Sequence, residues 1–499
     1  MLNYPQDIFL ELWIVFMENS DSGIQLEMNF NTPSGNRFRS CLERGVFTVL
    51  FEHAPPGREL PDDEAARRLE KLEKAVLAVK TMPCALALTD RCWSDERRRA
   101  VEYAALLPEK NRNSHLVYLS GRNTDSDSMQ GLLASAVSAG IANLVVVSGD
   151  SRPDEDARTL RRMDFTESVK TLRFIQQNPA WKNFFAGAAV NPNLYNAPAL
   201  YSSLFKLVKK FNMGAEFAVA QAGFDMAQLD ALRSYLFLRE YNQPLIARLM
   251  ILTPEKVEKI IAGELPGITI SEDFLNILTK ELRFSESQFE AAQYRRLELQ
   301  AAGCKLLGFG GIQICGADTA EKIDIAAQRI SRAMREFSNL SQWVEEYKFY
   351  MARSDIAPAD EHFYLFEKLL STAQFDETLP PLTEFTPPPQ SWAQRWGGSL
   401  RKFFFPEADI QDAGERRWLK KLLAGCPGCQ QCRLPQTFYH CPELCPKALS
   451  NGPCGGVRHN GWCEAGDFPC VHLAIWHSAE RSKCCAQLEN DFVGSGSDC

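Results

Sequence analysis

The feature that most constrains the fold is an alternation of short apolar segments with helical patterns along the first two thirds of the chain. The clearest apolar segment is Leu144-Val145-Val146-Val147, in which three of the four residues are β-branched. An uninterrupted apolar run of this length is typical of a strand that is buried on both faces. A repeated order of strand and helix predicts a parallel sheet.

Eight segments with this pattern are predicted as strands, with helical patterns between them. They are residues 46–52, 85–88, 114–119, 144–147, 184–190, 216–221, 245–252 and 304–314. Eight strands that alternate with helices predict a closed (β/α)8 TIM barrel. The alternative, an open doubly wound sheet, predicts a glycine-rich phosphate turn after the first strand. Residues 53–57 (His-Ala-Pro-Pro-Gly) contain no such turn, so we expect the barrel.

The length of 499 residues indicates more than one domain. We expect four parts: an N-terminal extension at residues 1–37, the barrel at 38–336, a helical segment with a proline-rich linker at 337–390, and a small cysteine-rich metal-binding domain at 391–499. The extension is either disordered or upstream of the native start, for which Met28 is the alternative. The apolar stretch at 8–17 is interrupted by Glu11 and is too short to span a bilayer, so we expect no signal peptide and no membrane segment.

The net charge and the distribution of the cysteines limit the classes of function that this chain can have. The formal net charge of -8 argues against a general nucleic-acid-binding protein. Eleven of the sixteen cysteines lie at or beyond Cys426. Clustered cysteines without a secretory signal indicate metal ligands in a reducing compartment, so we expect a cytoplasmic protein.

The spacing of these cysteines is typical of a metal site. Cys426-x2-Cys429-x2-Cys432 is the opening of a ferredoxin-type run, and Cys445 precedes a proline as the closing cysteine of such a run does. Four-thiolate zinc sites also use C-x2-C pairs, so zinc stays an alternative to iron–sulfur. The candidate ligands, enough for two four-cysteine sites, are Cys426, Cys429, Cys432, Cys441, Cys445, Cys454, Cys463 and Cys470. Four histidines could replace a thiolate: His440, His459, His472 and His477.

Polar side chains stand where the predicted strands end, and in a barrel the chemistry gathers at the C-terminal ends of the strands. These residues are Glu52, Thr89, Asp90, Asp150, Asn191 and Gln221. His115 lies at the start of the third strand, and Lys210, near the end of a helix, could reach a phosphate. Taken singly, each of these could equally be a helix cap or a solvated loop residue. Together, they would suit proton transfer and recognition of a polar heterocycle.

An ordered set of motifs resembles the methylenetetrahydrofolate reductase family over roughly residues 40–335. The motifs are Phe51-Glu52 followed by Pro55-Pro56, Ser148-Gly149-Asp150, Ala189-Val190-Asn191-Pro192, and Gly214-Ala215-Glu216 leading to Gln221 and Phe224-Asp225. Residues 441–470 contain Asn-Gly-Pro-Cys-Gly-Gly at 451–456. This stretch resembles the metal-binding partner subunit or C-terminal domain that accompanies the reductases of anaerobes using the reductive acetyl-CoA route.

The resemblance implies a flavin-containing barrel that reduces 5,10-methylenetetrahydrofolate to 5-methyltetrahydrofolate. Glu52 matches the general acid that opens the imidazolidine ring to an iminium ion. Asp150 matches the carboxylate beside the flavin, which stabilises that cation and binds the pterin, and Gln221 matches an amide that binds the pterin. The positions implied to contact the flavin are Thr89, His115, Gly149, Asp150, Asn191 and Lys210, with Lys210 facing phosphate.

The resemblance leaves the choice between FAD and FMN open, and the electron donor is either a protein or NAD(P)H. It also implies an oligomer or a complex with electron-transfer subunits. The alternative is a non-catalytic scaffold, in which the barrel is degenerate and a structural zinc domain docks a partner. The presence of both Glu52 and Asp150 favours the enzyme.

Overall fold

The computed structural model describes residues 35–90, 96–351, 418, 421–422, 425–429, 432–458 and 460–494. The predictions for the N-terminal extension up to residue 34, the alternative start and the proline-rich linker therefore lie outside the described residues. His459 lies outside them too. Of the helical segment predicted beyond residue 336, the described part is α15 (Leu340–Met351).

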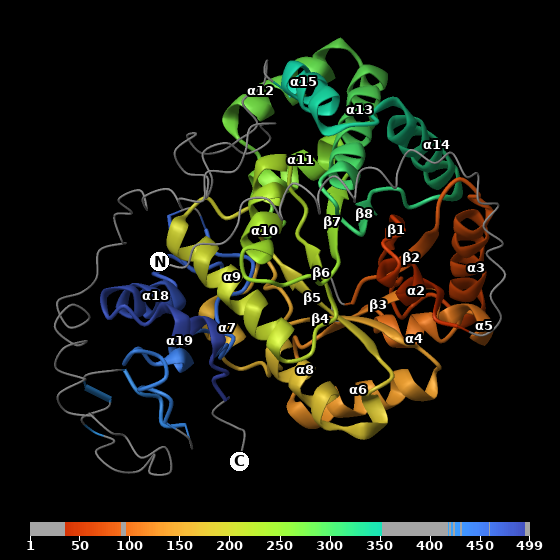
Figure 1. The fold of residues 1–499 in the computed structure, drawn as a ribbon. Helices are drawn as coiled ribbons and strands as arrows, with labels where there is room; N and C mark the ends of the chain where they lie inside the picture. The colour runs from red at the N-terminus through yellow and green to blue at the C-terminus, as the bar shows by residue number, and fades with distance from the viewer. Residues whose placement is uncertain are drawn as a thin grey trace, which may run out of the picture. The chain divides into compact units, whose positions relative to one another are not determined.

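The eight strands form one closed barrel of parallel strands in sequence order (Figure 1), so the predicted (β/α)8 fold is confirmed. The strands are β1 (Thr48–His53), β2 (Cys84–Leu88), β3 (Leu116–Ser120), β4 (Asn143–Val147), β5 (Phe185–Val190), β6 (Phe217–Ala220), β7 (Leu245–Met250) and β8 (Gly311–Cys315). The predicted start of the eighth strand is wrong. Cys304 belongs to the helix α13 (Glu286–Leu306), which carries the apolar pattern up to the turn before β8.

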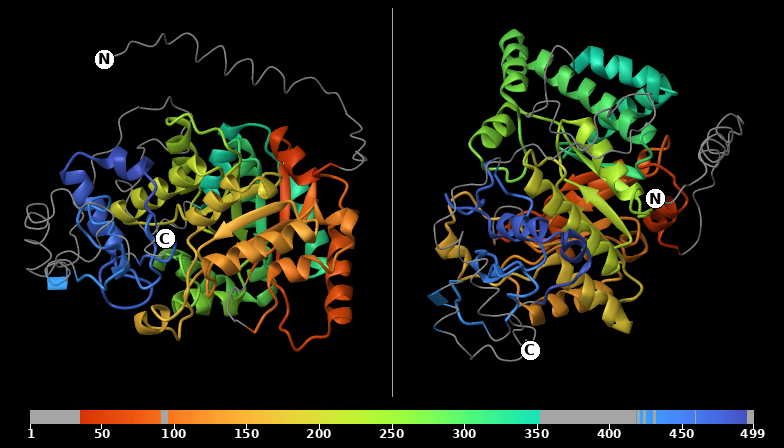
Figure 2. Two further views of the ribbon diagram at one scale, coloured as in Figure 1. Left: turned by 90° about the horizontal axis from the view of Figure 1, so that it is seen from below. Right: turned by 60° about the vertical axis from the view of Figure 1, so that its left-hand side comes forward.

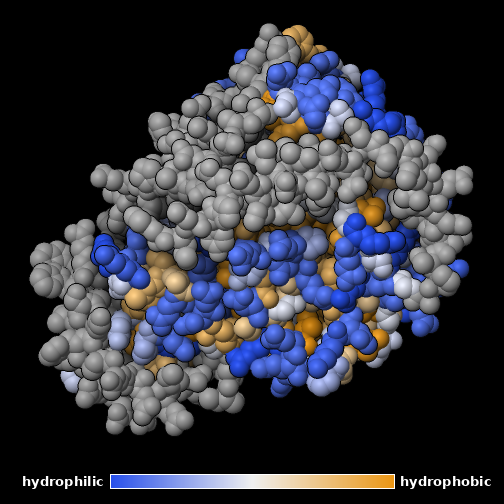
Figure 3. All heavy atoms as spheres, viewed as in Figure 1, coloured by the Kyte–Doolittle hydropathy of each residue, from blue (hydrophilic) through white to orange (hydrophobic). Residues whose placement is uncertain are grey.

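The helices between the strands pack their apolar sides on the barrel. In α3, Leu69, Leu72 and Val76 are buried, while the arginines and most glutamates face outward. Hydrophilic residues likewise gather over α14 and α15 in the upper part of Figure 3. The remaining helices of the barrel region are α2 (Arg37–Glu43), α4 (Ala100–Ala104), α5 (Glu109–Arg112), α6 (Ser126–Ser138), α7 (Ala157–Leu160), α8 (Ser168–Gln177), α9 (Ala197–Asn212), α10 (Met226–Phe237), α11 (Pro254–Ile261), α12 (Glu272–Phe284) and α14 (Ala320–Glu336).

Aromatic side chains fill the barrel interior near the N-terminal ends of its strands. Phe38 of α2 packs edge-on against Phe185 and Phe217, with ring centroids 5.9 and 5.6 Å apart. Phe185 and Phe217 stack on each other at 4.8 Å. Apolar groups therefore fill this end of the barrel interior, and we expect a polar ligand at the C-terminal ends of the strands.

The C-terminal region packs on the barrel through α9, which is buried along almost its whole length. Its helices α18 (Val471–Arg481) and α19 (Cys485–Asn490), blue in Figure 2, lie beside α9. Trp476 stacks on Tyr201 with ring centroids 5.8 Å apart, and Glu489 accepts hydrogen bonds of 2.6 Å from Tyr235 and Arg239. Within the described residues, no helix is long and apolar enough to cross a membrane.

Candidate active site

A cavity of about 650 Å³ opens at the C-terminal ends of the strands. Its volume falls in the range of roughly 300–1,000 Å³ that is usual for sites of small molecules and cofactors. Eight of the residues singled out in the sequence line it together: Glu52, Thr89, Asp90, Gly149, Asp150, Asn191, Lys210 and Gln221. The structure thus gathers side chains from five strand ends and one helix into a single site.

Glu52 lies at the centre of a polar network on the cavity floor. Its carboxylate accepts hydrogen bonds from Arg248 Nε at 2.6 Å and Nη2 at 2.7 Å, and from Gln313 Nε2 at 2.8 Å. Arg248 Nη1 donates to Gln221 Oε1 at 2.6 Å, and the Tyr118 hydroxyl donates to Gln313 Oε1 at 2.7 Å. Side chains of five strands are therefore joined by consecutive hydrogen bonds.

The network sets the charge of Glu52. Burial raises the pKa of this carboxyl group, but the Arg248 guanidinium and the hydrogen bond from Gln313 outweigh burial, so the pKa lies below its usual value. The same pairing holds the pKa of Arg248 well above its ordinary value. In this arrangement Glu52 is an ionised carboxylate at neutral pH.

Asp150 follows β4 and lines the cavity. Its side chain is exposed on the side of the cavity opening, while the protein around the cavity encloses it on the other sides. Burial raises its pKa, with a contribution from Glu464, while Lys447, Arg248 and Arg122 act in the opposite direction. Gly149 before it adopts φ +90°, and a Cβ there would lie 2.5 Å from the side chain of Arg122. Only glycine therefore suits the turn that presents Asp150.

A lysine of the C-terminal region reaches this turn. Lys447 is buried, donates a 2.7 Å hydrogen bond to the carbonyl oxygen of Gly149, and forms an ion pair with Glu464. Its charge is one of those that lower the pKa of Asp150. The C-terminal region therefore contributes to the electrostatics of the barrel cavity.

Besides Gly149 and Asp150, three of the residues predicted to contact the flavin line the cavity, and they differ in their hydrogen-bond partners. Thr89 follows β2 and is buried. Asn191 follows β5, and its amide donates to the carbonyl oxygens of Gly455 at 2.7 Å and Gly267 at 3.1 Å. Lys210 donates to the carbonyl oxygen of Ala189 at 2.5 Å, and burial lowers its pKa to about 7.

The prediction that His115 contacts the flavin is wrong in this structure. His115 precedes β3, at the end of the barrel away from the cavity, and is buried. Its Nδ1 accepts a hydrogen bond from the backbone N–H of Leu86 at 3.1 Å, and its Nε2 lies 3.0 Å from Glu73. Both ring nitrogens are used within the barrel wall, so His115 is a structural residue.

Arg248 and Gln313 are site residues that were not predicted from the sequence, although a signal for them is present. Both interrupt otherwise apolar strands, Leu-Ile-Ala-Arg-Leu-Met and Gly-Ile-Gln-Ile-Cys. Ile246 packs inside the barrel, so Arg248, two residues further on, faces the same way. The two residues are also register partners on neighbouring strands. A polar residue of a buried strand that faces the barrel interior, as judged by the alternation of side chains, is therefore a candidate site residue.

The eight candidate metal-ligating cysteines fall into two groups. The first cysteine group, which lines one small pocket, is Cys426, Cys429, Cys432 and Cys441. The second cysteine group is Cys445, Cys454, Cys463 and Cys470. Burial raises the pKa of Cys463 to about 11, with a contribution from Cys445; burial likewise raises the pKa of Cys470, to which Cys445 and Cys463 add. Cys454 also lines the barrel cavity.

These cysteines are free thiols in the structure. Within the described residues, no three His, Cys, Asp or Glu side chains converge in a way that could hold a metal ion. Thiolates are the donors that zinc and iron–sulfur clusters use, so the donor chemistry of each group fits such a centre.

A closed (β/α)8 barrel with carboxylates, amides and an arginine around one cavity at its C-terminal end defines a barrel protein with a site for a polar ligand. The family model described as "Methylenetetrahydrofolate reductase" matches residues 37–286, about half of the chain. The model described as "Methylene-tetrahydrofolate reductase C terminal" matches residues 405–495. The chain belongs to the methylenetetrahydrofolate reductase family.

Comparison with individual proteins adds little. Among curated proteins, none matches this chain. An uncharacterized protein from Clostridium thermocellum, which binds two copies of 5-methyl-5,6,7,8-tetrahydrofolic acid, is 13% identical; the alignment covers 59% of this chain and 98% of that chain with a TM-score of 0.43. A 7,8-dihydropteroate synthase from Vibrio fischeri ES114 is 12% identical, with 59% and 94% coverage and a TM-score of 0.33. Scores this low carry no argument about this chain.

Proposed function

We propose that this protein catalyses the flavin-dependent reduction of 5,10-methylenetetrahydrofolate to 5-methyltetrahydrofolate. The observation that carries the proposal is the convergence of Glu52, Asp150 and Gln221 on one cavity in a chain of this family. An acid, an anion and an amide are the groups needed to protonate a folate amine, to stabilise an iminium cation and to bind a pterin.

The cavity fits a flavin in size and in polarity. Thr89 lines it from the end of β2, Asn191 from the end of β5 and Lys210 from α9. A phosphate near Lys210 would favour the charged form of an amine whose pKa burial lowers to about 7. When bound, the flavin supplies a hydride to the folate. The protein's own residues then have to orient the pterin, deliver a proton and stabilise positive charge.

Glu52 as the general acid must carry a proton, and its contacts with Arg248 favour the ionised form. We therefore propose that the incoming pterin competes with Arg248 for Gln221 and thereby weakens the pairing of Arg248 with Glu52. Gln221 already accepts a hydrogen bond from Arg248 Nη1, so a ligand that binds Gln221 disturbs the network at that point. Once Arg248 turns away, burial raises the pKa of Glu52 towards the range of a useful acid.

Asp150 would stabilise the iminium ion that forms when the folate ring opens. Within the described residues, no side chain donates a hydrogen bond to its carboxylate, which leaves both oxygens for the ligand. A fixed negative charge that faces a developing cation in a partly enclosed cavity stabilises the transition state without reorganisation.

Electrons would reach the cavity through the cysteine-rich domain at residues 391–499, with iron–sulfur favoured over zinc as the centre. Cys454 lines the cavity, so the second cysteine group meets the site where the flavin would bind. A protein donor or NAD(P)H would supply the electrons.

A second function is favoured by one observation. The ion pair with Arg248 keeps Glu52 ionised, so that it carries no proton to donate. This is expected of a barrel that has lost catalysis and serves as a scaffold with a structural zinc domain. The visible absorbance spectrum of anaerobically purified protein distinguishes the two. The reductase should show flavin bands that bleach on reduction and return when 5,10-methylenetetrahydrofolate is added, and mass spectrometry of the released cofactor identifies FAD or FMN. A protein without flavin bands, which also fails to bind added FMN or FAD, would contradict the reductase.

A further inference from the structure

The motif Asn-Gly-Pro-Cys-Gly-Gly at residues 451–456 enters the wall of the barrel cavity. Pro453, Cys454 and Gly455 line the cavity together with Asp150 and Asn191. The carbonyl oxygen of Gly455 accepts the 2.7 Å hydrogen bond from Asn191. Residues that lie far from the barrel in sequence are thus part of its ligand site.

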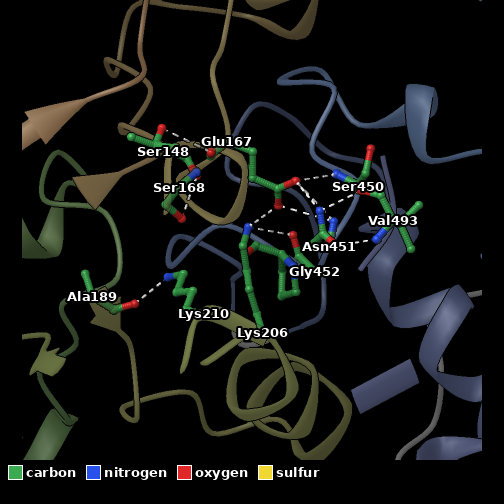
Figure 4. A network of polar contacts seen from close by, with 12 residues as sticks. Ser148, Glu167, Ser168, Ala189, Lys206, Lys210, Ser450, Asn451, Gly452 and Val493 are labelled. Carbon is green, nitrogen blue, oxygen red and sulfur yellow. Dashed lines mark hydrogen bonds and ion pairs between the residues drawn. The ribbon is translucent and has the colours of Figure 1, made fainter. Parts of the chain in front are cut away.

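One buried carboxylate on the barrel holds this motif (Figure 4). Glu167 accepts hydrogen bonds from the backbone N–H groups of Ser450 at 3.1 Å and Asn451 at 3.2 Å. It also accepts from the side-chain amide of Asn451 at 2.9 Å. The Asn451 side chain in turn bonds both backbone polar groups of Val493, at 2.8 and 2.9 Å. The motif is therefore fixed between the barrel and the end of the described chain.

A buried lysine completes the arrangement. The ammonium group of Lys206 lies 2.8 Å from the Glu167 carboxylate and donates to the carbonyl oxygens of Gly452 at 3.0 Å and Pro453 at 3.2 Å. All three hydrogens of the ammonium group therefore have partners. Gly452 adopts φ +141°, and a Cβ there would lie 3.0 Å from Lys206. We call Glu167, Lys206, Ser450 and Asn451 the Glu167 latch.

Glu167 is placed for this contact by the helix that follows it. It occupies the N-cap position of α8, yet its side chain makes no capping hydrogen bond. The Ser148 hydroxyl oxygen instead accepts the backbone N–H of Ser168 at 3.1 Å, so the latch adjoins the turn that presents Asp150. Burial raises the pKa of Glu167, but Lys206 and the hydrogen bonds from Asn451 and Ser450 lower it to about 2. The carboxylate is charged at any physiological pH.

We propose that Glu167 is a positioning residue that fixes residues 450–453 and thereby places the thiol of Cys454 in the cavity wall, next to the bound flavin. The identity of the ligand rests on the proposed function; the latch itself does not. Because Cys454 lines the cavity, a ligand bound there protects its thiol, and loss of the latch reduces this protection. Ligand binding and the exposure of Cys454 are then coupled reciprocally.

The first test measures hydrogen exchange of peptides within residues 447–458 in the full-length protein. Glu167→Gln keeps the shape of the side chain and removes the charge that pairs with Lys206. Loss of charge-assisted hydrogen bonds should speed exchange in these peptides by about tenfold or more. Glu281→Gln is the matched control, because Glu281 pairs with Arg296 at 3.0 Å between α12 and α13 and should leave these peptides unchanged. Unchanged exchange in Glu167→Gln overturns the proposal.

Asn451→Ala breaks the same contacts from the other side and leaves the barrel sequence intact. It should reproduce the faster exchange, and it keeps the test valid if Glu167→Gln fails to fold. Unchanged exchange in a folded Asn451→Ala protein also counts against the latch.

The second test measures the alkylation rate of Cys454 by iodoacetamide in the full-length protein treated with a metal chelator, with and without FMN or FAD. Cys484, which lies in neither cysteine group, is the reference. In the native protein the flavin should slow the labelling of Cys454 selectively. In Glu167→Gln the labelling of Cys454 should rise about tenfold, with less protection by the flavin. Faster exchange without any change in Cys454 labelling would show that Glu167 holds residues 450–453 but does not place the Cys454 thiol. That result overturns the positioning role. A protein that binds neither FMN nor FAD contradicts the proposed function, while the rise in labelling without ligand still decides the role of Glu167.

Discussion

The carboxylate of Glu52 accepts two hydrogen bonds from the guanidinium of Arg248, at 2.6 and 2.7 Å, across the mouth of the barrel. The two residues stand on β1 and β7, which are separated by β8, and Gln313 of β8 bonds the same carboxylate. The pair keeps Glu52 ionised, so the state of Arg248 decides whether Glu52 can act as an acid.

Arg248→Met should destabilise the protein by about 3 kcal/mol at pH 7, because it leaves the Glu52 carboxylate buried without its partner. The pKa of Glu52 is lowered in the folded protein. Its stabilising contribution is therefore present above the unfolded pKa and is lost as the pH falls through the folded pKa. The deficit of the variant should shrink below about pH 4. Urea unfolding at pH 7 and at about pH 3 measures both effects.

The double variant Glu52→Gln/Arg248→Met serves as the control for this pair. Removing both charges should cost less than the sum of the two single changes, since no uncompensated charge remains. Strictly additive free energies of unfolding would show that the two residues do not interact in solution.

Glu52→Gln should lower folate reduction by about a hundredfold or more, while reduction of the flavin by dithionite survives. Glutamine keeps the hydrogen-bonding shape but carries no acidic proton. The matched control is Glu73→Gln, which changes a buried, paired carboxylate beside His115 at the opposite end of the barrel. Steady-state rates of methylenetetrahydrofolate reduction decide the matter. A Glu52→Gln protein with more than a tenth of the native turnover would exclude the acid role.

The sequence predicted the barrel because each strand is buried on both faces and leaves a local signature of apolar, β-branched residues. It placed Glu52, Asp150 and Gln221 correctly at one mouth, because the ends of parallel strands converge. The flavin contact of His115 was implied by the family resemblance alone; the strand pattern already placed this residue at the start of the third strand, away from the mouth, and the structure keeps it there.

The partners of the site residues could not be predicted in the same way. Arg248 meets Glu52 only because the barrel closes, which brings β7 and β1 within two strands of each other. Glu167 meets Asn451 across 284 residues of sequence, and no local pattern encodes that contact. Long-range ion pairs depend on the packing of whole elements, which neither helical nor strand periodicity reports.

Asp150→Asn should raise the melting temperature at neutral pH and weaken folate binding. The pKa of Asp150 is raised in the folded protein. The folded state therefore binds more protons than the unfolded state as the pH rises above the ordinary aspartate pKa, and stability falls there. Removing the charge relieves this cost and removes the anion that faces the pterin. Calorimetry and folate titration of the same samples measure the two effects.

Asp156→Ala is the companion to that experiment, because Asp156 caps α7 by accepting a 2.8 Å hydrogen bond from Thr159. Its loss should lower the melting temperature slightly, with unchanged folate binding. A lower melting temperature and normal folate binding in Asp150→Asn would assign Asp150 the same purely structural role.

The two cysteine groups should hold separate metal centres, with iron–sulfur expected. Anaerobically purified protein should contain about four or more irons per chain and acid-labile sulfide. Cys432→Ser in the first group and Cys463→Ser in the second should each remove about half of the iron, because a missing thiolate weakens only its own centre. Cys484→Ser is the control, since this cysteine lies in the same region but in neither group. Metal analysis and low-temperature electron paramagnetic resonance of the reduced protein measure the outcome. One or two zincs without iron would exclude the electron relay and leave a structural domain that docks a partner.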